Sequence, residues 1–571
     1  MSRRASHPEP VACSIGDNSA TRREFLTRMR GAAAATLTSA AVTPGSSADA
    51  DQGPPGSVDG GSVERVLDSY ENRVRAARAE TRVPVPRQIT NGDERRYLSF
   101  IGNFSKGLPH NNLGEVDPAV YRSLLDAVRQ GTAAAFENLT LGGNTKLVNP
   151  LAGLAFDLEG TDSHQLVIPP FPQLASQALA DQAVELYWMA LCRDVNFTDY
   201  ESTTLTMNAA KELSKFPLFK GVKPRTLFRG FTAEHKIGPY VSQFLLKKFS
   251  YGPYTMSRLM NVAVPDIDYL TSEAQWLASQ NGQGPFGANQ VDGTLRCLRN
   301  GRDLASYVHT DPNAGLFMSF YNAGIFLFEQ NALLQGSSSL LNPGNPYLHY
   351  KTQDPFGTFG VPFFLGLVGE AAVRAFKAAW YAKWFVHRAL RPDQYGGLVH
   401  WAKTGKVAYP IPTNALDSEA VTGVFTKNGT YFLPQAYPEA GPQHPSYPSG
   451  HATMAGACAT ILKAAFNGGV QFNTLPDGKI VAARSDGGDV MDYTDPDKDQ
   501  ITINGELNKL ASNIAQGRDF AGIHWRSDAE EGMRLGEVVA ISILRDQSDN
   551  YVGEDFEGFR ITKFDGATIT V

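Results

Sequence analysis

The stretch GEAAVRAFKAAWYAKWFVHRALRP, residues 369–392, carries the pattern that decides the fold class. Its many alanines, mixed with Glu, Lys and Arg, favour an α-helix. Pro392 pushes the preceding residue out of helical geometry, so Arg391 is expected at the end of this helix, where it can turn back toward Lys383. A lysine and an arginine on a helix most often form a solvated face, so this stretch alone predicts a helix and no function.

Helical spacing of apolar residues recurs elsewhere in the chain, at residues 175–193 and 314–334. Strand-like alternation of apolar and polar residues is scarce, so the sequence predicts a mainly α fold. Two long connections interrupt the helical pattern, at residues 405–442 and 467–505, and the second is compatible with a short hairpin.

Composition excludes several classes of protein. The 571 residues are 42% hydrophobic and 19% charged, which is ordinary for a globular chain. The net charge is -6 and the mature region has no basic block, which argues against a nucleic-acid partner. After the leader no apolar stretch approaches the roughly 20 residues that span a bilayer, so no membrane is expected. The length favours two helical regions, 85–330 and 331–571.

The N-terminus resembles an export signal. TRREFL, residues 21–26, is a twin-arginine pattern, and an apolar run at 31–42 and Ala48-Asp49-Ala50 follow it. Residues 1–50 are therefore predicted to be a Tat signal peptide, which places the mature protein in the periplasm or outside the cell. The alternative is an Ala-rich tail that contains an arginine pair by chance. Residues 51–84 are rich in Gly, Ser and Arg and are expected to be flexible.

The cysteines do not form a metal or disulfide framework. Cys13 leaves with the leader, and Cys192, Cys297 and Cys458 are widely spaced without a C-x-x-C pattern. This argues against a disulfide scaffold and against zinc or iron–sulfur sites. One pair could bridge in an oxidising compartment, and the spacing does not say which pair.

Two further segments carry chemically active side chains. In PQHPSYPSGH, residues 442–451, Ser449, Gly450 and His451 directly precede a helix-forming run at 452–466. They therefore lie at a helix N-terminus, whose free N–H groups and dipole attract anions. The alternative is that Ser449 only caps the helix and His451 is a polar residue of its first turn.

The last segment is GRDFAGIHWRSD, residues 517–528. Asp528 and Glu531 are expected to form a capping box for the next helix, which puts His524 in an accessible turn just before it. Taken singly, Arg518 and His524 would more often be structural residues.

Together these side chains suit a tetrahedral oxyanion such as phosphate or vanadate. Arginine offers a planar fork for its charged oxygens and lysine a point charge. The backbone N–H of Gly450 and the hydroxyl of Ser449 add neutral donors. One histidine nitrogen can attack or coordinate the central atom, and a second histidine can pass protons.

The order Lys383-x7-Arg391-Pro, Pro-Ser449-Gly450-His451, Gly-Arg518-x5-His524 resembles the signature shared by vanadium haloperoxidases and the acid phosphatases of the type 2 phosphatidic acid phosphatase superfamily. The resemblance implies an all-α fold with two four-helix-bundle-like halves, long loops and a few short strands. It places the site at the helix ends of the C-terminal half.

The haloperoxidase resemblance also implies a role for each residue. His524 would bond vanadium through a ring nitrogen, and His451 would act as acid and base when hydrogen peroxide binds. Lys383 would polarise the bound peroxide toward halide attack. The oxygens of vanadate would be held by Lys383, Arg391, Ser449, Gly450 and Arg518. The vanadium would serve as Lewis acid and template.

The alternative is an exported acid phosphatase, because the same pocket can hydrolyse phosphate esters with His524 as a phosphohistidine nucleophile and His451 as general acid. A non-catalytic secreted helical protein is a third hypothesis. Residues outside the pocket favour the haloperoxidase: LYWMALCRDV (186–195) and GPYVSQF (238–244) resemble segments of algal and bacterial bromoperoxidases. The likeness runs from about Asn91 to the C-terminus.

Two positions bear on the halide. Bromoperoxidases tend to have a histidine where His444 stands, and such a histidine can hydrogen-bond the vanadate region and tune its basicity. The alternative is a loop histidine without contacts. Trp380 departs from the red algal pattern, which has arginine there, and matches chloroperoxidases. We expect efficient oxidation of bromide and iodide and weak oxidation of chloride, with organic molecules as the halogen acceptors.

The resemblance further implies a homo-oligomer and a structural calcium ion, whose ligands the sequence does not place. His387 and Arg388 lie near Lys383, and a packing or surface role is expected for them.

Overall fold

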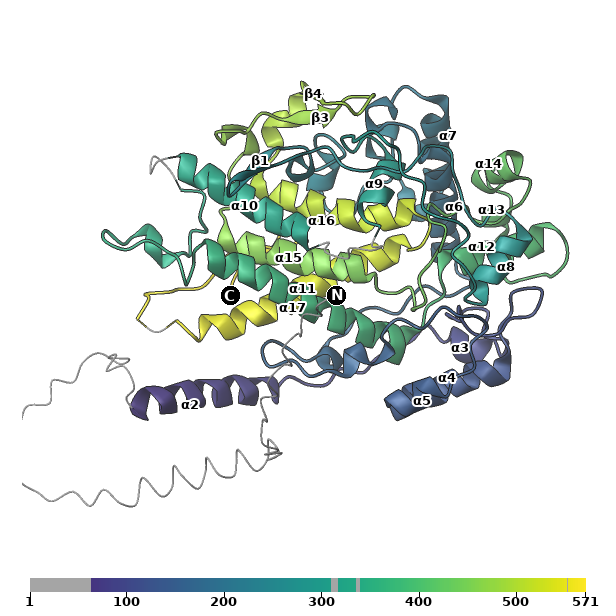
Figure 1. Cartoon of the computed structure of the whole chain (residues 1–571), viewed down its shortest axis with the longest axis horizontal. Coiled ribbons are helices and arrows are strands. Elements are labelled where there is room, and N and C mark those ends of the chain that lie inside the picture. The colour runs from purple at the N-terminus through teal and green to yellow at the C-terminus, as the bar shows by residue number, and fades with distance from the viewer. Residues whose placement is uncertain (1–62, 310–316, 335–338, 552) are drawn as a thin grey trace, which may run out of the picture. The chain divides into compact units, whose positions relative to one another are not determined.

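The computed structural model describes residues 63–309, 317–334, 339–551 and 553–571 (Figure 1). The predicted signal peptide at residues 1–50 lies outside the described residues. The first helices are α2 (Val63–Glu80), α3 (Asp93–Arg96), α4 (Pro118–Gln130), α5 (Ala133–Glu137), α6 (Gln177–Cys192), α7 (Thr204–Leu213), α8 (Glu273–Gln280), α9 (Gly301–Tyr307) and α10 (Met318–Leu333). The later ones are α11 (Val361–Tyr381), α12 (Pro392–Lys403), α13 (Thr413–Leu416), α14 (Glu419–Asn428), α15 (Gly450–Ala465), α16 (Ile503–Phe520) and α17 (Arg526–Ser548).

Four helices of the C-terminal region form the centre of the molecule. Helix α15 packs against α11, α16 and α17, and α11 also packs against α17 (Figure 1). Every residue of α15 except His451 is buried, and every residue of α16 is buried. The start of α15 and the end of α16, which carry the predicted site, are therefore held by a core on several sides.

Small residues let α15 and α17 approach closely. A β-carbon on Gly456 of α15 would lie 2.2 Å from the carbonyl oxygen of Met533, and one on Gly536 of α17 would lie 1.9 Å from that of Thr453. Only glycine fits at such distances, because real β-carbons do not approach a backbone oxygen so closely. The two glycines thereby fix the position of α17 relative to the first turns of α15.

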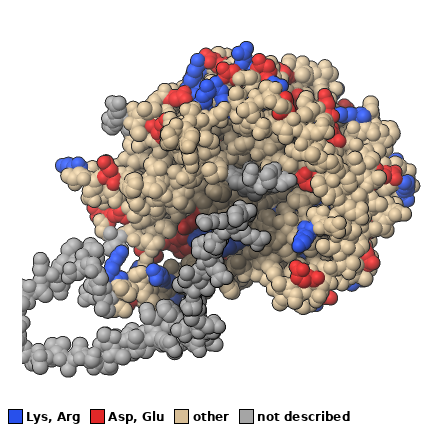
Figure 2. Space-filling model, viewed as in Figure 1, with Lys and Arg blue, Asp and Glu red and all other residues tan. Residues whose placement is uncertain are grey.

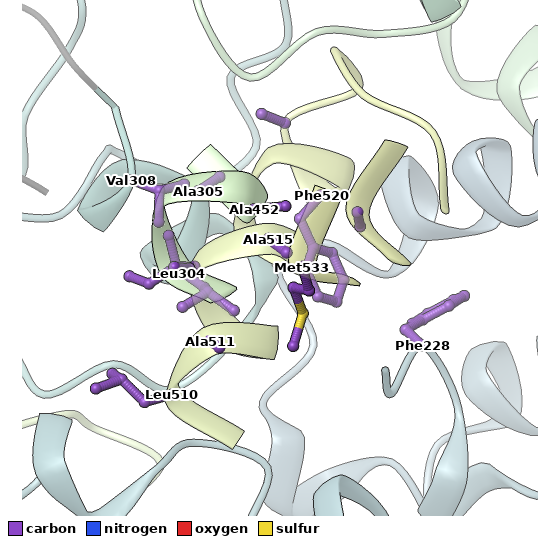
Figure 3. Close-up of a cluster of buried hydrophobic side chains, with 14 of the residues drawn as sticks. Phe228, Leu304, Ala305, Val308, Ala452, Leu510, Ala511, Ala515, Phe520 and Met533 are labelled. Carbon is purple, nitrogen blue, oxygen red and sulfur yellow. The ribbon is translucent and has the colours of Figure 1, made fainter. Parts of the chain in front are cut away.

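The core continues from α16 toward α9. Leu304, Ala305 and Val308 lie beside Ala511 and Ala515 of α16 in one cluster of buried side chains, and Phe520 and Phe228 extend it (Figure 3). Val308 follows α9, and its carbonyl oxygen accepts a hydrogen bond from Arg518 in the last turn of α16.

Helices from both sides of residue 330 pack together. Helix α6 packs against α7, and also against α13, α14 and α16 of the C-terminal region. The described residues belong to one compact unit. The division into regions 85–330 and 331–571 stays a prediction.

Strands are few and short, as predicted. The described residues contain three two-stranded antiparallel sheets. They pair β1 (Phe249–Tyr251) with β2 (Tyr254–Met256), β3 (Val481–Ala483) with β4 (Val490–Asp492), and β5 (Arg560–Thr562) with β6 (Thr568–Thr570). The hairpin of β3 and β4 lies in the connection at residues 467–505, which the sequence suggested could contain a short hairpin. The all-α fold class is confirmed, since the other regular elements of the described chain are helices, including short 3-10 turns.

Two local features are relevant to points raised by the sequence, and the flexibility of the segment at residues 51–84 stays a prediction. Residues 63–80, inside the segment expected to be flexible, form the regular helix α2. The Gly- and Ser-rich composition belongs to residues 53–62, whereas 63–80 are rich in Ala, Arg and Glu, which favour a helix. Cys192, Cys297 and Cys458 are all free and buried, so none of these three forms the disulfide considered from the sequence.

The surface carries no extended block of one charge on the face shown in Figure 2. Basic and acidic side chains are interspersed along its upper edge, and most of the face is uncharged. Among the described residues no helix combines the length and apolar character needed to cross a bilayer.

A buried lysine in α15 gives the fold a pH dependence. Lys463 lies with its Nζ 3.8 Å from the centre of the Phe564 ring and 4.0 Å from Glu537 Oε1. Burial lowers the pKa of Lys463 to about 8 from its ordinary 10.5. The unfolded chain therefore binds the proton more tightly, so the free energy of unfolding should rise as the pH rises from about 8 to about 10.5.

We expect Lys463→Met to remove up to about 3 kcal/mol of this rise. Urea denaturation of both proteins at pH 7.5 and pH 10.5 measures it. The control Lys351→Met replaces an exposed lysine and should behave as the wild type. Equal pH dependence of wild type and Lys463→Met would contradict the assignment.

Candidate active site

Lys383 lies on an irregular turn that follows α11. The helix ends at Tyr381, and residues 382–387 form a π-helical turn closed by a 3.0 Å hydrogen bond from Arg388 N to the Lys383 carbonyl. Arg388 then adopts a left-handed conformation with φ 42°. Arg391 is the residue before the first turn of α12, so it begins the next helix instead of ending the helix of Lys383. Such π-turns are frequent at functional sites because they redirect side chains.

The ammonium group of Lys383 binds the second sequence segment. Its Nζ donates to the carbonyl oxygens of Pro445 and Ser446, at 2.7 and 2.6 Å. The side chain is fully buried. Two of the three ammonium donors are thus fixed by backbone oxygens, and the third remains for a ligand.

The guanidinium of Arg391 joins all three segments. Its Nε donates to the carbonyl of His444 at 2.9 Å and its Nη1 to the carbonyl of Ile523 at 2.8 Å. Nη1 also lies 3.1 Å from Nε2 of His524, and Nη2 lies 3.0 Å from Nδ1 of His444. The planar guanidinium group of Arg391 therefore contacts the rings of both His444 and His524 and holds them close together.

His524 is oriented from its other ring nitrogen. Nδ1 lies 2.7 Å from Oδ2 of Asp528, and the same oxygen accepts from the hydroxyl of Ser446 and from the backbone N–H of Trp525. A carboxylate on Nδ1 fixes the ring and leaves Nε2 as the nitrogen that can coordinate or attack. This is the arrangement that a metal-binding or nucleophilic histidine requires.

The role of Asp528 corrects the expected capping box. Helix α17 begins at Arg526, so Asp528 is its third residue and Trp525 precedes its first turn. Asp528 does close a cap with the N–H of Trp525, but Glu531 takes no part and instead pairs with Arg534. The sequence pattern showed an acidic residue near a helix start and did not show that this residue also holds His524.

Ser449, Gly450 and His451 lie where the sequence placed them. Ser449 precedes α15, its hydroxyl accepts from the N–H of Ala452 at 3.4 Å, and its own N–H donates to the carbonyl of Asp528 at 3.0 Å. A β-carbon on Gly450 would lie 2.8 Å from the Trp380 ring, so the backbone approaches this ring closely. His451 is the partly buried residue of α15, and its Nε2 has no hydrogen-bond partner among the residues that the structure describes.

Arg518 closes the site from the end of α16. Its Nη1 donates to the carbonyl of Val308 at 3.0 Å, and its guanidinium lies 5.5 Å from the centre of the Tyr437 ring. Its Nε is buried, and none of the described residues hydrogen-bonds to it. Its charge lowers the pKa of both Lys383 and His451, which places it within electrostatic reach of the other site residues.

His444 and Trp380 form one wall. Their ring centres are 4.8 Å apart with planes tilted by 35°, and the indole N–H of Trp380 donates to the carbonyl of Val148 at 3.0 Å. His444 is buried and bonded to Arg391, so the alternative of a loop histidine without contacts does not apply. His387 is buried against Tyr447 and Arg388 pairs with Glu94, in agreement with the packing roles expected for them.

The site is a buried concentration of positive charge. Burial and the neighbouring Arg391 and Arg518 hold the pKa of Lys383 well below its usual range, although Asp528 opposes this. Burial lowers the pKa of Arg391 to about 9, again against the effect of Asp528. Burial and the same cations keep His524 and His451 neutral by lowering their pKa values. A bound anion would relieve this repulsion, so the geometry favours an oxyanion with several charged oxygens.

The structure thus brings all the predicted site residues together and adds two that the motif reading missed. Asp528 and Ser446 fix His524 and lie between the predicted residues in space. The only sequence signal for Asp528 was its position four residues after His524, one helical turn away. Nothing in the sequence distinguished Ser446 from the other polar residues of its loop.

Comparisons with known proteins show which proteins the chain is similar to. A family model described as the second helical-bundle domain of VCPO matches residues 363–552, which include all three segments. The chain is 33% identical over 525 residues to a vanadium-dependent bromoperoxidase of Ascophyllum nodosum, covering 87% of this chain and 91% of that protein. It is 32% identical to the vanadium-dependent bromoperoxidase of Corallina pilulifera, covering 89% of this chain and 98% of that one.

A solved structure agrees over nearly the whole fold. The homohexameric second vanadate-dependent bromoperoxidase of Ascophyllum nodosum superposes with a TM-score of 0.83 at 29% identity, covering 94% of this chain and 95% of that one. From the sequence identity over most of its length, the chain belongs to the vanadium-dependent bromoperoxidase family.

Proposed function

We propose that this protein is a vanadium-dependent bromoperoxidase, which uses hydrogen peroxide to oxidise bromide or iodide to a hypohalous-acid-equivalent halogenating species. The observation that carries the proposal is the His524 ring, held by Asp528 on one nitrogen and by Arg391 on the other among three buried cations. Family membership supports the reaction, because the relatives are vanadium-dependent bromoperoxidases.

The residues present fit a vanadate ion. Nε of Arg518 and Nε2 of His451 are buried and have no partner in the described chain, and Lys383 has one donor that no described residue uses. An oxyanion placed among these groups would satisfy them and would neutralise the three cations. The Ser449 hydroxyl and the Gly450 N–H at the start of α15 add donors from a helix N-terminus.

When bound, vanadate would supply a Lewis acid that activates hydrogen peroxide without changing its own oxidation state. The protein provides the rest of the chemistry. His524 offers Nε2 as the ligand, because Asp528 occupies Nδ1. His451 is neutral and unpartnered at Nε2, so it can take a proton from hydrogen peroxide and return it later. Lys383 presents a cationic donor that withdraws electron density from the oxygen that the halide attacks.

A dye assay tests the proposal. Purified protein stripped of vanadate should brominate a phenol dye with hydrogen peroxide only after orthovanadate is added, and orthophosphate should compete with that activation. Bromide and iodide should turn over faster than chloride. Phosphate-ester hydrolysis that vanadate inhibits, without halogenation, would support the acid phosphatase instead. Chloride turnover equal to bromide turnover would contradict the halide assignment.

Three further properties are part of the proposal. Assembly into a homo-oligomer is supported by the homohexameric relative, and light scattering of the purified protein tests it. Export through the Tat pathway is supported by the twin-arginine segment, and replacing Arg22 and Arg23 by lysine should retain the protein in the cytoplasm. A structural calcium ion stays a prediction. Among the described residues, no group of three or more His, Cys, Asp or Glu side chains could hold a metal ion. Thermal unfolding measured with and without EGTA tests whether calcium stabilises the protein.

A further inference from the structure

A buried ion pair from outside the sequence motif lies beside Arg391. Nζ of Lys106 is 2.5 Å from Oδ2 of Asp393, and both side chains are completely shielded from solvent. Asp393 follows Arg391 by two residues in the first turn of α12. Lys106 belongs to the loop between α3 and α4, almost 300 residues away in sequence.

The loop that carries Lys106 is joined to the turn that carries Arg391. Phe104 N donates to the carbonyl of Arg388 at 2.8 Å, and Asn103 forms a β-bridge with Ala389. Gln394 connects the two segments, because its amide donates to Ser105 Oγ at 3.0 Å while its oxygen accepts from the N–H of Arg391. The position of Lys106 is therefore coupled to that of Arg391.

The ion pair and Arg391 share one small space. A β-carbon on Gly441 would lie 3.1 Å from Asp393 Oδ1, 3.4 Å from Lys106 Nζ and 3.5 Å from Arg391 Cδ. Oδ1 of Asp393 is buried and has no hydrogen-bond partner in the segments that the structure describes. Within the described part of the chain, the guanidinium of Arg391 bonds to carbonyl oxygens and imidazole nitrogens, and none of these partners is a carboxylate.

Removing the charge of Lys106 would leave a carboxylate without a counterion next to a guanidinium. Opposite charges attract strongly in a buried setting, so Asp393 would then draw Arg391 toward itself. The uncompensated negative charge would also repel an incoming oxyanion. Both effects act against binding at the site.

We propose that Lys106 is a positioning residue for the oxyanion site: it neutralises Asp393 and so keeps Arg391 in the position from which it contributes to binding the oxyanion. This inference rests on the proposed function, because the oxyanion concerned is vanadate. This role differs from a packing role, because it depends on the positive charge of Lys106. The charge of Asp393 should be harmful only when Lys106 is absent.

Binding of orthovanadate to the stripped protein, measured by isothermal titration calorimetry, tests the proposal, with orthophosphate as a second probe. Lys106→Met should weaken vanadate binding about 10–100-fold. Lys106→Arg should bind almost as the wild type does. The double variant Lys106→Met/Asp393→Asn should recover most of the lost affinity, because it removes the unpaired charge.

A matched control separates this effect from the loss of any buried lysine. Lys509 pairs with Glu506 at 2.6 Å, and both are almost fully buried in α16. Lys509→Met should bind vanadate as the wild type does. Circular dichroism identifies variants that fail to fold, and if Lys106→Met is one of them, Asp393→Asn and the double variant are compared and should bind equally well.

The outcomes distinguish the inference from the function it rests on. A wild-type protein that does not bind vanadate would overturn the proposed function. Wild-type binding together with unchanged affinity in folded Lys106→Met would overturn the role of Lys106. A double variant that binds no better than Lys106→Met, or that differs from Asp393→Asn, would overturn it too.

Discussion

Replacing His524 by alanine should reduce bromide oxidation by about a thousandfold or more, because it removes the ring nitrogen that would coordinate vanadium. In the structure Nε2 of His524 faces Arg391 Nη1 at 3.1 Å, and Nδ1 is occupied by Asp528. His444 is bonded to the same guanidinium, and His451 lies in the first turn of α15. Steady-state bromination with saturating orthovanadate measures the effect.

The control for this variant is a buried histidine outside the site. His400 lies on α12, stacks on Phe432 and accepts from the N–H of Tyr431. His400→Ala also removes a buried ring, and it should lower the thermal stability while leaving most of the bromide turnover. If both variants lost activity equally, the loss in His524→Ala would reflect damage to the fold and the assignment of the ligand would be wrong.

The second large effect concerns a residue that the motif does not contain. Asp528→Asn should lower bromide oxidation about 10–100-fold, since carboxylates that orient metal-bound histidines have effects of this size. Asparagine keeps the size of the side chain but offers a neutral amide. It would replace a charged acceptor shared by Nδ1 of His524, the hydroxyl of Ser446 and the N–H of Trp525. The ring would then lose its fixed orientation.

Burial destabilises the charged form of Asp528. Desolvation raises the pKa of this carboxyl to about 6, against the opposing effects of the Ser446 hydroxyl and of Lys383. At neutral pH the group stays mostly charged, because the hydroxyl of Ser446 and the charge of Lys383 partly offset the effect of burial. Vanadate affinity and bromination rate of Asp528→Asn should both fall, because the ligand and its orientation are coupled.

Glu531→Gln provides the comparison for Asp528→Asn. Glu531 lies one turn further along α17 and pairs with Arg534, away from His524. The Glu531→Gln variant should keep its bromination rate within about twofold of the wild-type rate, as is usual for substitutions outside the site. Full activity in Asp528→Asn would show that His524 needs no carboxylate partner, and this would contradict the role given to Asp528.

Local sequence determined much of the site. The helix propensity of residues 369–392, the breaking effect of Pro392 and the Ser-Gly-His at a helix start depend on neighbours in sequence, so they could be predicted without a structure. The structure changed one detail of this prediction. Arg391 begins α12, because a π-turn and the left-handed Arg388 separate it from the helix of Lys383.

The sequence by itself determined the helical class, the residue types for an oxyanion and the three segments that carry them, because hydrophobic period, capping and charge are local properties. Only the tertiary structure decided that Asp528 holds His524 and that Lys106 faces Asp393 beside Arg391. Lys106 and Asp393 meet because segments far apart in the chain are packed together. Asp528 is only four residues from His524, and this spacing allows the contact but does not show that the two side chains make it. The partner of a buried charge depends on what the fold brings near it.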